Sequence, residues 1–278
     1  MSGIPPLAAQ RGQSAGPLKI ADVLFEDYEG WKRPRLELPA GAEAVLYFRI
    51  EGFERREGRD EAGIPEYQVD LRWEVQMHDP QGTLVVPPQQ GRLEQRLGPR
   101  DDQWQPAVRW SAVIPPWAPS GSYPVRIRVS DEIGRQQAEH TARLQIRGEA
   151  VPEASAFQAI RFGFARSPDG PWTATRYFAL RDPVHVRFTV VGFQVSPDKR
   201  VWVEQDWAVV DAEGRVMVQQ PNAIREQSQE FYPPRYLTTT FQVELQDPRP
   251  GSYKLQIALR DRIGEQAYAL EAPFTLRP

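Results

Sequence analysis

The chain of 278 residues contains no cysteine, which excludes disulfide bonds, zinc–thiolate sites and thiol nucleophiles. No stretch approaches the roughly 18 consecutive apolar residues of a membrane-spanning helix. The formal net charge is only −3, and this argues against a general nucleic-acid binder, which usually carries a basic excess. Histidine is scarce as well, and the three that occur show no i, i+4 pair of the kind that binds metal on a helix.

Local motifs for catalysis are also missing. The chain has no G-x-S-x-G nucleophile elbow and no glycine-rich phosphate loop that opens a helix. Nucleophilic hydrolysis and nucleotide binding therefore have no support, and we expect a protein that is not an enzyme and uses no cofactor. A dispersed pair of carboxylates for glycoside hydrolysis needs no local motif, so a hydrolase of that kind stays open as the weaker alternative.

Four D-x-x-G segments begin at Asp79, Asp131, Asp211 and Asp261. Each lacks the dense acidic spacing of a calcium loop, so we interpret them as hairpin turns and predict no metal site. Aspartate bonds its own backbone in such turns, and glycine accepts the left-handed conformation. We therefore expect a positive φ at Gly134 and at Gly264.

Turn-forming residues are abundant, because 27 Pro and 20 Gly indicate many turns and few long helices. Residues 121–134 (GSYPVRIRVSDEIG) recur as residues 251–264 (GSYKLQIALRDRIG), with seven of fourteen positions identical. Apolar residues alternate with the others in both copies, which predicts a strand with one face in a core. We expect Tyr123 and Tyr253, which begin the inward face, to be buried. The sequence thus contains an internal repeat.

The repeat extends over both halves of the chain, and each half supplies about seven short strands in roughly 120 residues. This spacing is typical of a β-sandwich. The predicted organisation is a disordered N-terminal segment at 1–17, a first domain at 18–147, a linker at 148–156 and a second domain at 157–278. The linker consists mainly of small and acidic residues and contains a proline.

Both halves end with the Gly-Ser-Tyr strand, a D-x-x-G turn and one last strand. This order resembles the end of bacterial immunoglobulin-like repeats. The resemblance implies an all-β chain of two tandem immunoglobulin-like β-sandwich domains, with structural or binding roles outside the cytoplasm. It names no ligand.

The first half carries extra residues in one charged segment, 54–66. From Gly52 to Asp79 there are 27 positions and from Gly192 to Asp211 there are 19, so the first copy is longer by eight. We interpret 54–66 as a loop. Loops at the ends of a sandwich often carry recognition, and the candidate binding residues here are Arg55, Arg56 and Arg59. The interpretation that we favour is a solvated loop without a partner.

Aromatic residues in the loops form a second set of candidates. These are Trp104 and Trp117 in the first half and Tyr232 and Tyr236 in the second. Such side chains can stack on sugars or anchor a protein partner. The alternative, which we favour, is that they cap the open ends of the sandwiches.

One outward face of the first half is rich in arginine. It combines Arg72, Arg126, Arg128, Arg143 and Arg147 with Glu74 and Glu139. A salt-bridged, solvated surface is the favoured interpretation, and contact with an acidic partner is the alternative. By the same alternation, His78 falls on the outward row of its strand.

The sequence predicts a binding or structural module that contacts a protein or a cell-surface polymer and has no catalytic role. A pair of carbohydrate-binding modules that use loop aromatics is the alternative. We expect no nucleic-acid partner and no membrane span. We also expect an extracytoplasmic location, with the signal peptide absent from this chain; a cytoplasmic location stays open.

Overall fold

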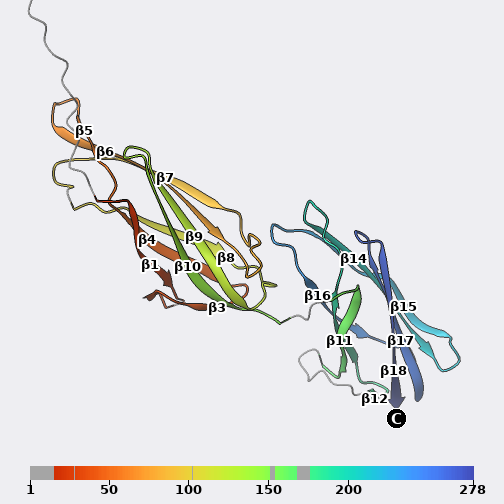
Figure 1. Cartoon of the computed structure of the whole chain (residues 1–278). Coiled ribbons are helices and arrows are strands. Elements are labelled where there is room, and N and C mark those ends of the chain that lie inside the picture. The colour runs from red at the N-terminus through yellow and green to blue at the C-terminus, as the bar shows by residue number, and fades with distance from the viewer. Residues whose placement is uncertain (1–15, 28, 102, 151–153, 168–175) are drawn as a thin grey trace, which may run out of the picture. The chain divides into compact units, whose positions relative to one another are not determined.

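The computed structural model describes residues 16–27, 29–101, 103–150, 154–167 and 176–278. These residues form strands, turns and irregular segments without a helix, and the predicted all-β class is confirmed (Figure 1). Within them there is accordingly no helix long and apolar enough to cross a membrane. Most of the predicted disordered segment 1–17 and the middle of the predicted linker 148–156 lie outside the described residues.

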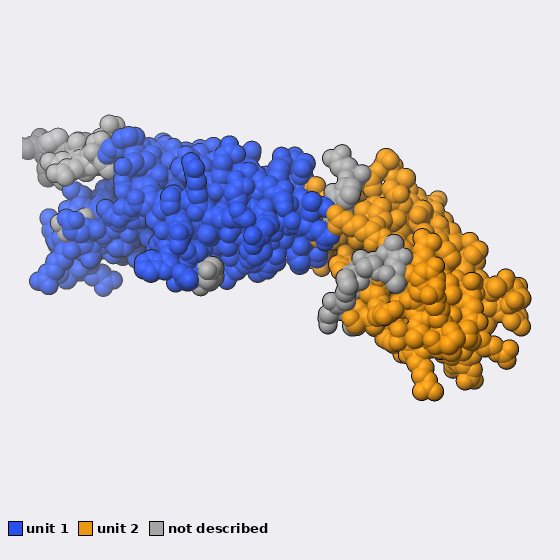
Figure 2. Space-filling model, turned by 90° about the horizontal axis from the view of Figure 1, so that it is seen from below, with its two compact units in different colours: residues 1–150 blue, residues 151–278 orange. Residues whose placement is uncertain are grey.

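The chain divides into two compact units, residues 1–150 and 151–278 (Figure 2). Unit 1 contains a four-stranded sheet in the order β2-β1-β4-β8. Its strands are β1 (Lys19–Glu26), β2 (Lys32–Arg33), β4 (Glu43–Glu51) and β8 (Ala107–Val113). The larger sheet has the order β3-β10-β9-β6-β5, and β7 also pairs with β6. Its strands are β3 (Glu37–Pro39), β5 (Arg56–Arg59), β6 (Pro65–Met77), β7 (Gln89–Leu97), β9 (Gly121–Asp131) and β10 (Gln136–Arg147).

Unit 2 repeats this order of strands, except that β2 and β5 have no counterpart among its described strands. Its smaller sheet is β11-β13-β16, and its larger sheet is β12-β18-β17-β14-β15. The strands are β11 (Gln158–Ala165), β12 (Tyr177–Ala179), β13 (Val184–Val191), β14 (Arg200–Asp211), β15 (Val216–Gln229), β16 (Tyr236–Val243), β17 (Gly251–Asp261) and β18 (Gln266–Arg277). Even a β-bulge recurs, between Ala21 and Leu24 in β1 and between Ile160 and Gly163 in β11. The sequence repeat is therefore a repeat of hydrogen-bonding topology.

The core of unit 2 lies between its two sheets. Trp207 of β14 stacks on Phe241 of β16 with ring centroids 5.2 Å apart, and Phe164 of β11 lies 5.8 Å from Phe274 of β18. Each pair joins one sheet to the other. Alternation along each strand thus delivers the apolar face of both sheets into one cluster.

The repeated tyrosines are buried as predicted, with Tyr123 at 0% and Tyr253 at 6% exposure. Each hydroxyl donates a hydrogen bond to a carbonyl four residues earlier. Tyr123 bonds Pro119 at 2.7 Å, and Tyr253 bonds Arg249 at 2.8 Å. The phenol therefore ties the connection before the strand to the start of the strand.

The expectation of positive φ at Gly134 and Gly264 is wrong. The positive values occur one residue later, at Arg135 (53°) and Glu265 (51°). Glycine is required for a different reason, since a Cβ on Gly134 would lie 2.5 Å from Asp131 Oδ2, and one on Gly264 would lie 2.4 Å from Asp261 Oδ2. In both turns the backbone at the glycine approaches the buried aspartate so closely that there is no room for a side chain.

His78 is also placed differently from the prediction, because it is buried rather than outward and solvated. Its N–H donates to the carbonyl of Pro124 at 3.0 Å, and it forms an isolated bridge with Leu84. The chain after the Asp79 turn thus folds back over the end of β6. Strand alternation alone does not reveal this cover.

Candidate functional site

The charged segment 54–66 is largely a β-hairpin rather than a loop. β5 pairs with residues 65–68 of β6, and the turn between them is held by Asp60. Asp60 Oδ1 accepts hydrogen bonds from the N–H groups of Ala62 (2.9 Å) and Ile64 (2.8 Å). The missed signal is another D-x-x-G turn, Asp60 to Gly63, of the same kind as the four turns recognised in the sequence. The extra residues of the first repeat therefore lengthen its larger sheet.

Two of the predicted binding residues meet at this end of unit 1. Arg55 Nη2 donates to the carbonyl of Trp104 at 3.2 Å, and its guanidinium lies 5.6 Å from the ring centroid of Phe53. Phe53 in turn packs edge-on against Trp104, with centroids 5.9 Å apart. The two candidates are thus engaged with each other and with the buried Phe53.

The remaining predicted residues are dispersed. Arg56 and Arg59 are exposed on β5, and Arg59 Nη1 donates to the carbonyl of Gly63 at 2.8 Å. Trp117 is half-buried beyond the opposite end of β8 from Trp104. In unit 2, Tyr236 is half-buried at the start of β16, whereas Tyr232 is only 3% exposed and offers a ligand almost no surface.

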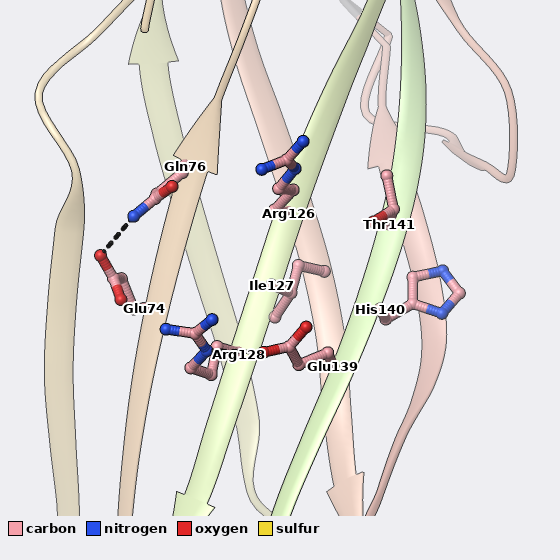
Figure 3. Close-up of a pocket in the computed structure, with 8 residues that line it drawn as sticks. All are labelled: Glu74, Gln76, Arg126, Ile127, Arg128, Glu139, His140 and Thr141. Atoms are coloured by element: carbon pink, nitrogen blue, oxygen red, sulfur yellow. Dashed lines mark hydrogen bonds and ion pairs between the residues drawn. The ribbon is translucent and has the colours of Figure 1, made fainter. Parts of the chain in front are cut away.

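A polar recess lies on the outward face of β6, β9 and β10 in unit 1 (Figure 3). Strand register lines up two rungs across this face. One rung is Gln76, Arg126 and Thr141, and the other is Glu74, Arg128 and Glu139. Ile127 and the exposed His140 complete the lining. Sequence alternation predicted the face, but it could not predict the recess.

Charges in the recess are only partly paired. Arg128 Nε lies 2.8 Å from Glu139 Oε1, and Gln76 Nε2 donates to Glu74 at 2.7 Å. Arg126 is exposed, and within the part of the chain that the structure describes its guanidinium has neither a hydrogen bond nor an ion pair. Its guanidinium stands between Gln76 and Thr141 on the neighbouring strands (Figure 3). This arrangement offers hydrogen-bond donors to an anionic group.

Unit 2 has a recess at the equivalent place, on the outward face of its larger sheet. Its rungs are Ala208, Gln256 and Glu271, and Asp206, Ala258 and Ala269. Gln256 replaces Arg126, and its amide is bonded to Glu271 at 2.9 Å. The two repeats thus keep the recess and change its chemistry from charged to largely apolar.

Beside the recess of unit 2, a buried carboxylate is surrounded by arginines. The side chain of Glu204 is 6% exposed and lies 2.7 Å from Arg262, 3.5 Å from Arg260 and 3.6 Å from Arg225. The hydrogen bond from Arg262 is the main cause that holds the pKa of Glu204 below its usual value, against the opposing effect of burial. At the equivalent positions of unit 1 the polarity is reversed, as Arg72 lies 3.7 Å from Glu132.

Metal-binding geometry is not found in the described parts of either unit, where no group of three His, Cys, Asp or Glu side chains could hold an ion.

No protein-family model and no curated protein sequence matches the chain. Among solved structures, dimeric latent PorU from Porphyromonas gingivalis matches 94% of this chain at 10% identity and a TM-score of 0.32. The C-terminal domain of the AgI/II polypeptide BspA from Streptococcus agalactiae matches 93% at 8% identity and a TM-score of 0.29.

A third solved structure, the alkylpurine DNA glycosylase AlkC from Pseudomonas fluorescens bound to DNA, matches 48% of this chain at 13% identity and a TM-score of 0.27. The matched region is 24% of the PorU chain, all of the BspA chain and 31% of the AlkC chain. At these TM-scores the similarities carry no inference about function.

Proposed function

We propose that this chain is a non-catalytic binding module of two tandem immunoglobulin-like β-sandwiches, and that it presents the outward face of its larger sheets to a partner outside the cytoplasm. The partner that we favour is a protein, and a cell-surface polymer is the alternative.

Two features support the immunoglobulin-like assignment. The first strand region of each unit contributes to both sheets, since β1 joins the smaller sheet and β3 pairs in parallel with β10 of the larger one. The hydroxyls of Tyr123 and Tyr253 bond upstream carbonyls where the penultimate strand begins. This is the arrangement called a tyrosine corner in such sandwiches.

The observation that carries the binding role is the recess repeated at equivalent positions in both units. A structural spacer needs a soluble outer face but no hollow in it. Both units keep the same cross-strand pairing at the recess, but the side chains differ: Gln256 stands in place of Arg126, and Ala258 in place of Arg128. Such divergence on a shared frame supports contact with different parts of one partner.

A sugar-binding role through loop aromatics has weaker support. Tyr232 is buried, and Trp104 is half-buried against Phe53 and Arg55. Platforms that stack on sugars need an open aromatic face, which these contacts restrict.

The test is site-specific photocrosslinking in the native organism. A photoreactive amino acid is placed at Gln137 or Ala267, which are exposed, equivalent outward positions on β10 and β18. Matched control positions on the smaller sheets are Val113 of β8 and Thr240 of β16, both exposed. We expect the same protein to crosslink from the larger-sheet positions and not from the controls. Equal crosslinking from all four positions, or none from either larger sheet, would remove the proposal.

A further inference from the structure

We propose that the recess of unit 1, together with Arg143 next to it on β10, binds carboxylates of an extended acidic peptide from a protein partner, through the guanidiniums of Arg126 and Arg143. This inference deepens the proposed function and depends on it.

The first step is the charge that remains after pairing. Arg143 lies two residues after Thr141 on β10, and Thr141 pairs directly with Arg126. The two arginines are thus diagonal neighbours on one face, with separations of about 7–8 Å between their positions on the strands. Both are exposed, and neither guanidinium has a hydrogen bond or an ion pair with any residue that the structure describes.

The second step is that the other arginines of this face already have carboxylates near them. Arg128 is paired with Glu139 at 2.8 Å, Arg72 with Glu132 at 3.7 Å, and Arg147 with Glu37 at 3.8 Å. The acidic groups that could neutralise Arg126 and Arg143 are therefore largely occupied. Glu74, which also lines the recess, accepts a hydrogen bond from the neutral amide of Gln76 and keeps its negative charge. Two unpaired guanidiniums stand against the one carboxylate of Glu74, and an external carboxylate would complement this positive excess.

The third step concerns the donors. A carboxylate accepts hydrogen bonds through two oxygens, and a guanidinium presents donors in a planar fork that matches them. The hydroxyl of Thr141 lies beside Arg126 on the same rung (Figure 3). Arginine and hydroxyl together supply a charged donor and a neutral donor on adjacent strands.

The fourth step selects a peptide. No Trp, Tyr or Phe side chain occupies the outward positions of β6, β9 and β10 among the described residues, and the one ring in the recess lining is the small imidazole of His140, so a sugar ring would find little stacking surface there. The outer edge of β10 pairs with β3 only at residues 145–147. Next to Thr141 and Arg143 that edge carries no paired strand in the described structure, and an open edge accepts an extended peptide.

Unit 2 provides an internal control. Gln256 and Pro273 stand where unit 1 has Arg126 and Arg143, and Gln256 is bonded to Glu271. The same fold, with the same open edge on β18, therefore lacks the two free guanidiniums. We assign the acidic peptide to unit 1 alone.

The experiment is isothermal titration calorimetry of the full chain with hexaglutamate peptide and, separately, with polygalacturonate, at low ionic strength because salt screens exposed charges. Charge-assisted hydrogen bonds lead us to expect that Arg126→Gln and Arg143→Gln each weaken hexaglutamate binding by about tenfold. Arg126→Gln installs the residue of the second repeat. The matched control is Arg96→Gln, which removes the same charge from the outward face of β7, eight residues or about 27 Å away along the sheet.

Equal weakening by Arg96→Gln, no binding of hexaglutamate, or binding of polygalacturonate at least as tight as that of the peptide would each overturn the inference. Unchanged thermal unfolding of Arg126→Gln and Arg143→Gln shows that folding is not the cause. Failure is separable from failure of the proposed function. If Gln137 still crosslinks a partner and Arg126→Gln leaves that crosslink unchanged, the acidic-peptide site is wrong while the binding role remains.

Discussion

The carboxylate of Asp131 accepts a hydrogen bond from the backbone N–H of Glu54 at 2.7 Å, across 77 positions of sequence. Its other oxygen accepts from the N–H groups of Ile133 and Gly134, both at 3.0 Å. Asp261 repeats the long-range bond, to the N–H of Gln194 at 2.8 Å. Each aspartate is 1% exposed. These two D-x-x-G turns are thus anchors between distant segments as well as hairpin turns.

We predict that Asp131→Ala lowers the free energy of unfolding of unit 1 by about 3 kcal/mol, because buried N–H donors lose their acceptor. Asp60→Ala is the control, since Asp60 caps an exposed turn through local bonds alone. We expect it to cost less than about 1 kcal/mol. Urea unfolding measures both, and similar losses in the two variants would contradict the anchoring role.

The second prediction concerns Gly134→Ala, where the added methyl would meet the carboxylate of Asp131. The expected loss is about 2 kcal/mol, in the range of overpacking. Gly58→Ala in β5 is the control, because its Cβ would find only ordinary contact at 3.6 Å. The unfolding transition of unit 2 should stay where it is. A shift of both transitions together would mean that the two units unfold as one.

The third prediction is a pH dependence that arises from Glu204. Its pKa in the folded protein lies below the ordinary 4.5, chiefly through the hydrogen bond from Arg262. The unfolded chain therefore binds more protons as the pH falls through this range, and unit 2 loses stability below about pH 5. Glu204→Gln should destabilise unit 2 at pH 7 and should differ less from the unmodified protein at pH 3. Chemical unfolding at both pH values measures this, and an equal difference at both would exclude Glu204 as the source.

The fourth prediction links His78 to the recess. Burial, followed by the charge of Arg126, lowers the pKa of His78 below its ordinary 6.5, against the opposing effect of Asp79. The unfolded chain then takes up a proton that the folded chain does not, so unit 1 loses stability as the pH falls below about 6.5. Arg126→Gln should raise the pKa of His78 in an NMR titration. Arg96→Gln is the control. An unchanged pKa of His78 in the Arg126→Gln variant would mean that the guanidinium of Arg126 does not lie near the imidazole.

Sequence patterns predicted the strands wherever one face is apolar, as in residues 121–134, because a period of two follows directly from the geometry of a strand. They did not predict the hairpin around Asp60, because its residues are polar on both faces and show no alternation of apolar and polar side chains. Nor could they show which arginines are paired. Arg126 and Arg128 have the same outward position and similar neighbours in sequence, and only the register with β10 gives Glu139 to Arg128.

The reversed polarity of the Arg72–Glu132 and Glu204–Arg262 pairs has a consequence for how the chain folds. Two homologous units on one chain can exchange equivalent strands and become trapped in a chimera. If β6 took the place of β14, Arg72 would stand beside Arg260 and Arg262, and Glu204 would stand beside Glu132 in the other hybrid. Like charges would then meet in both products. We infer that these charges favour pairing of each strand within its own unit.

The fifth prediction concerns the double variant Arg72→Glu with Glu132→Arg, which reverses the charge pair of unit 1. Unit 1 then carries the polarity of unit 2, and both hybrids regain opposite charges. We expect a larger fraction of misfolded chains after dilution from urea, measured at low protein concentration, while native stability changes little because the pair is exposed. An unchanged refolding yield would mean that side-chain packing alone keeps the two repeats apart.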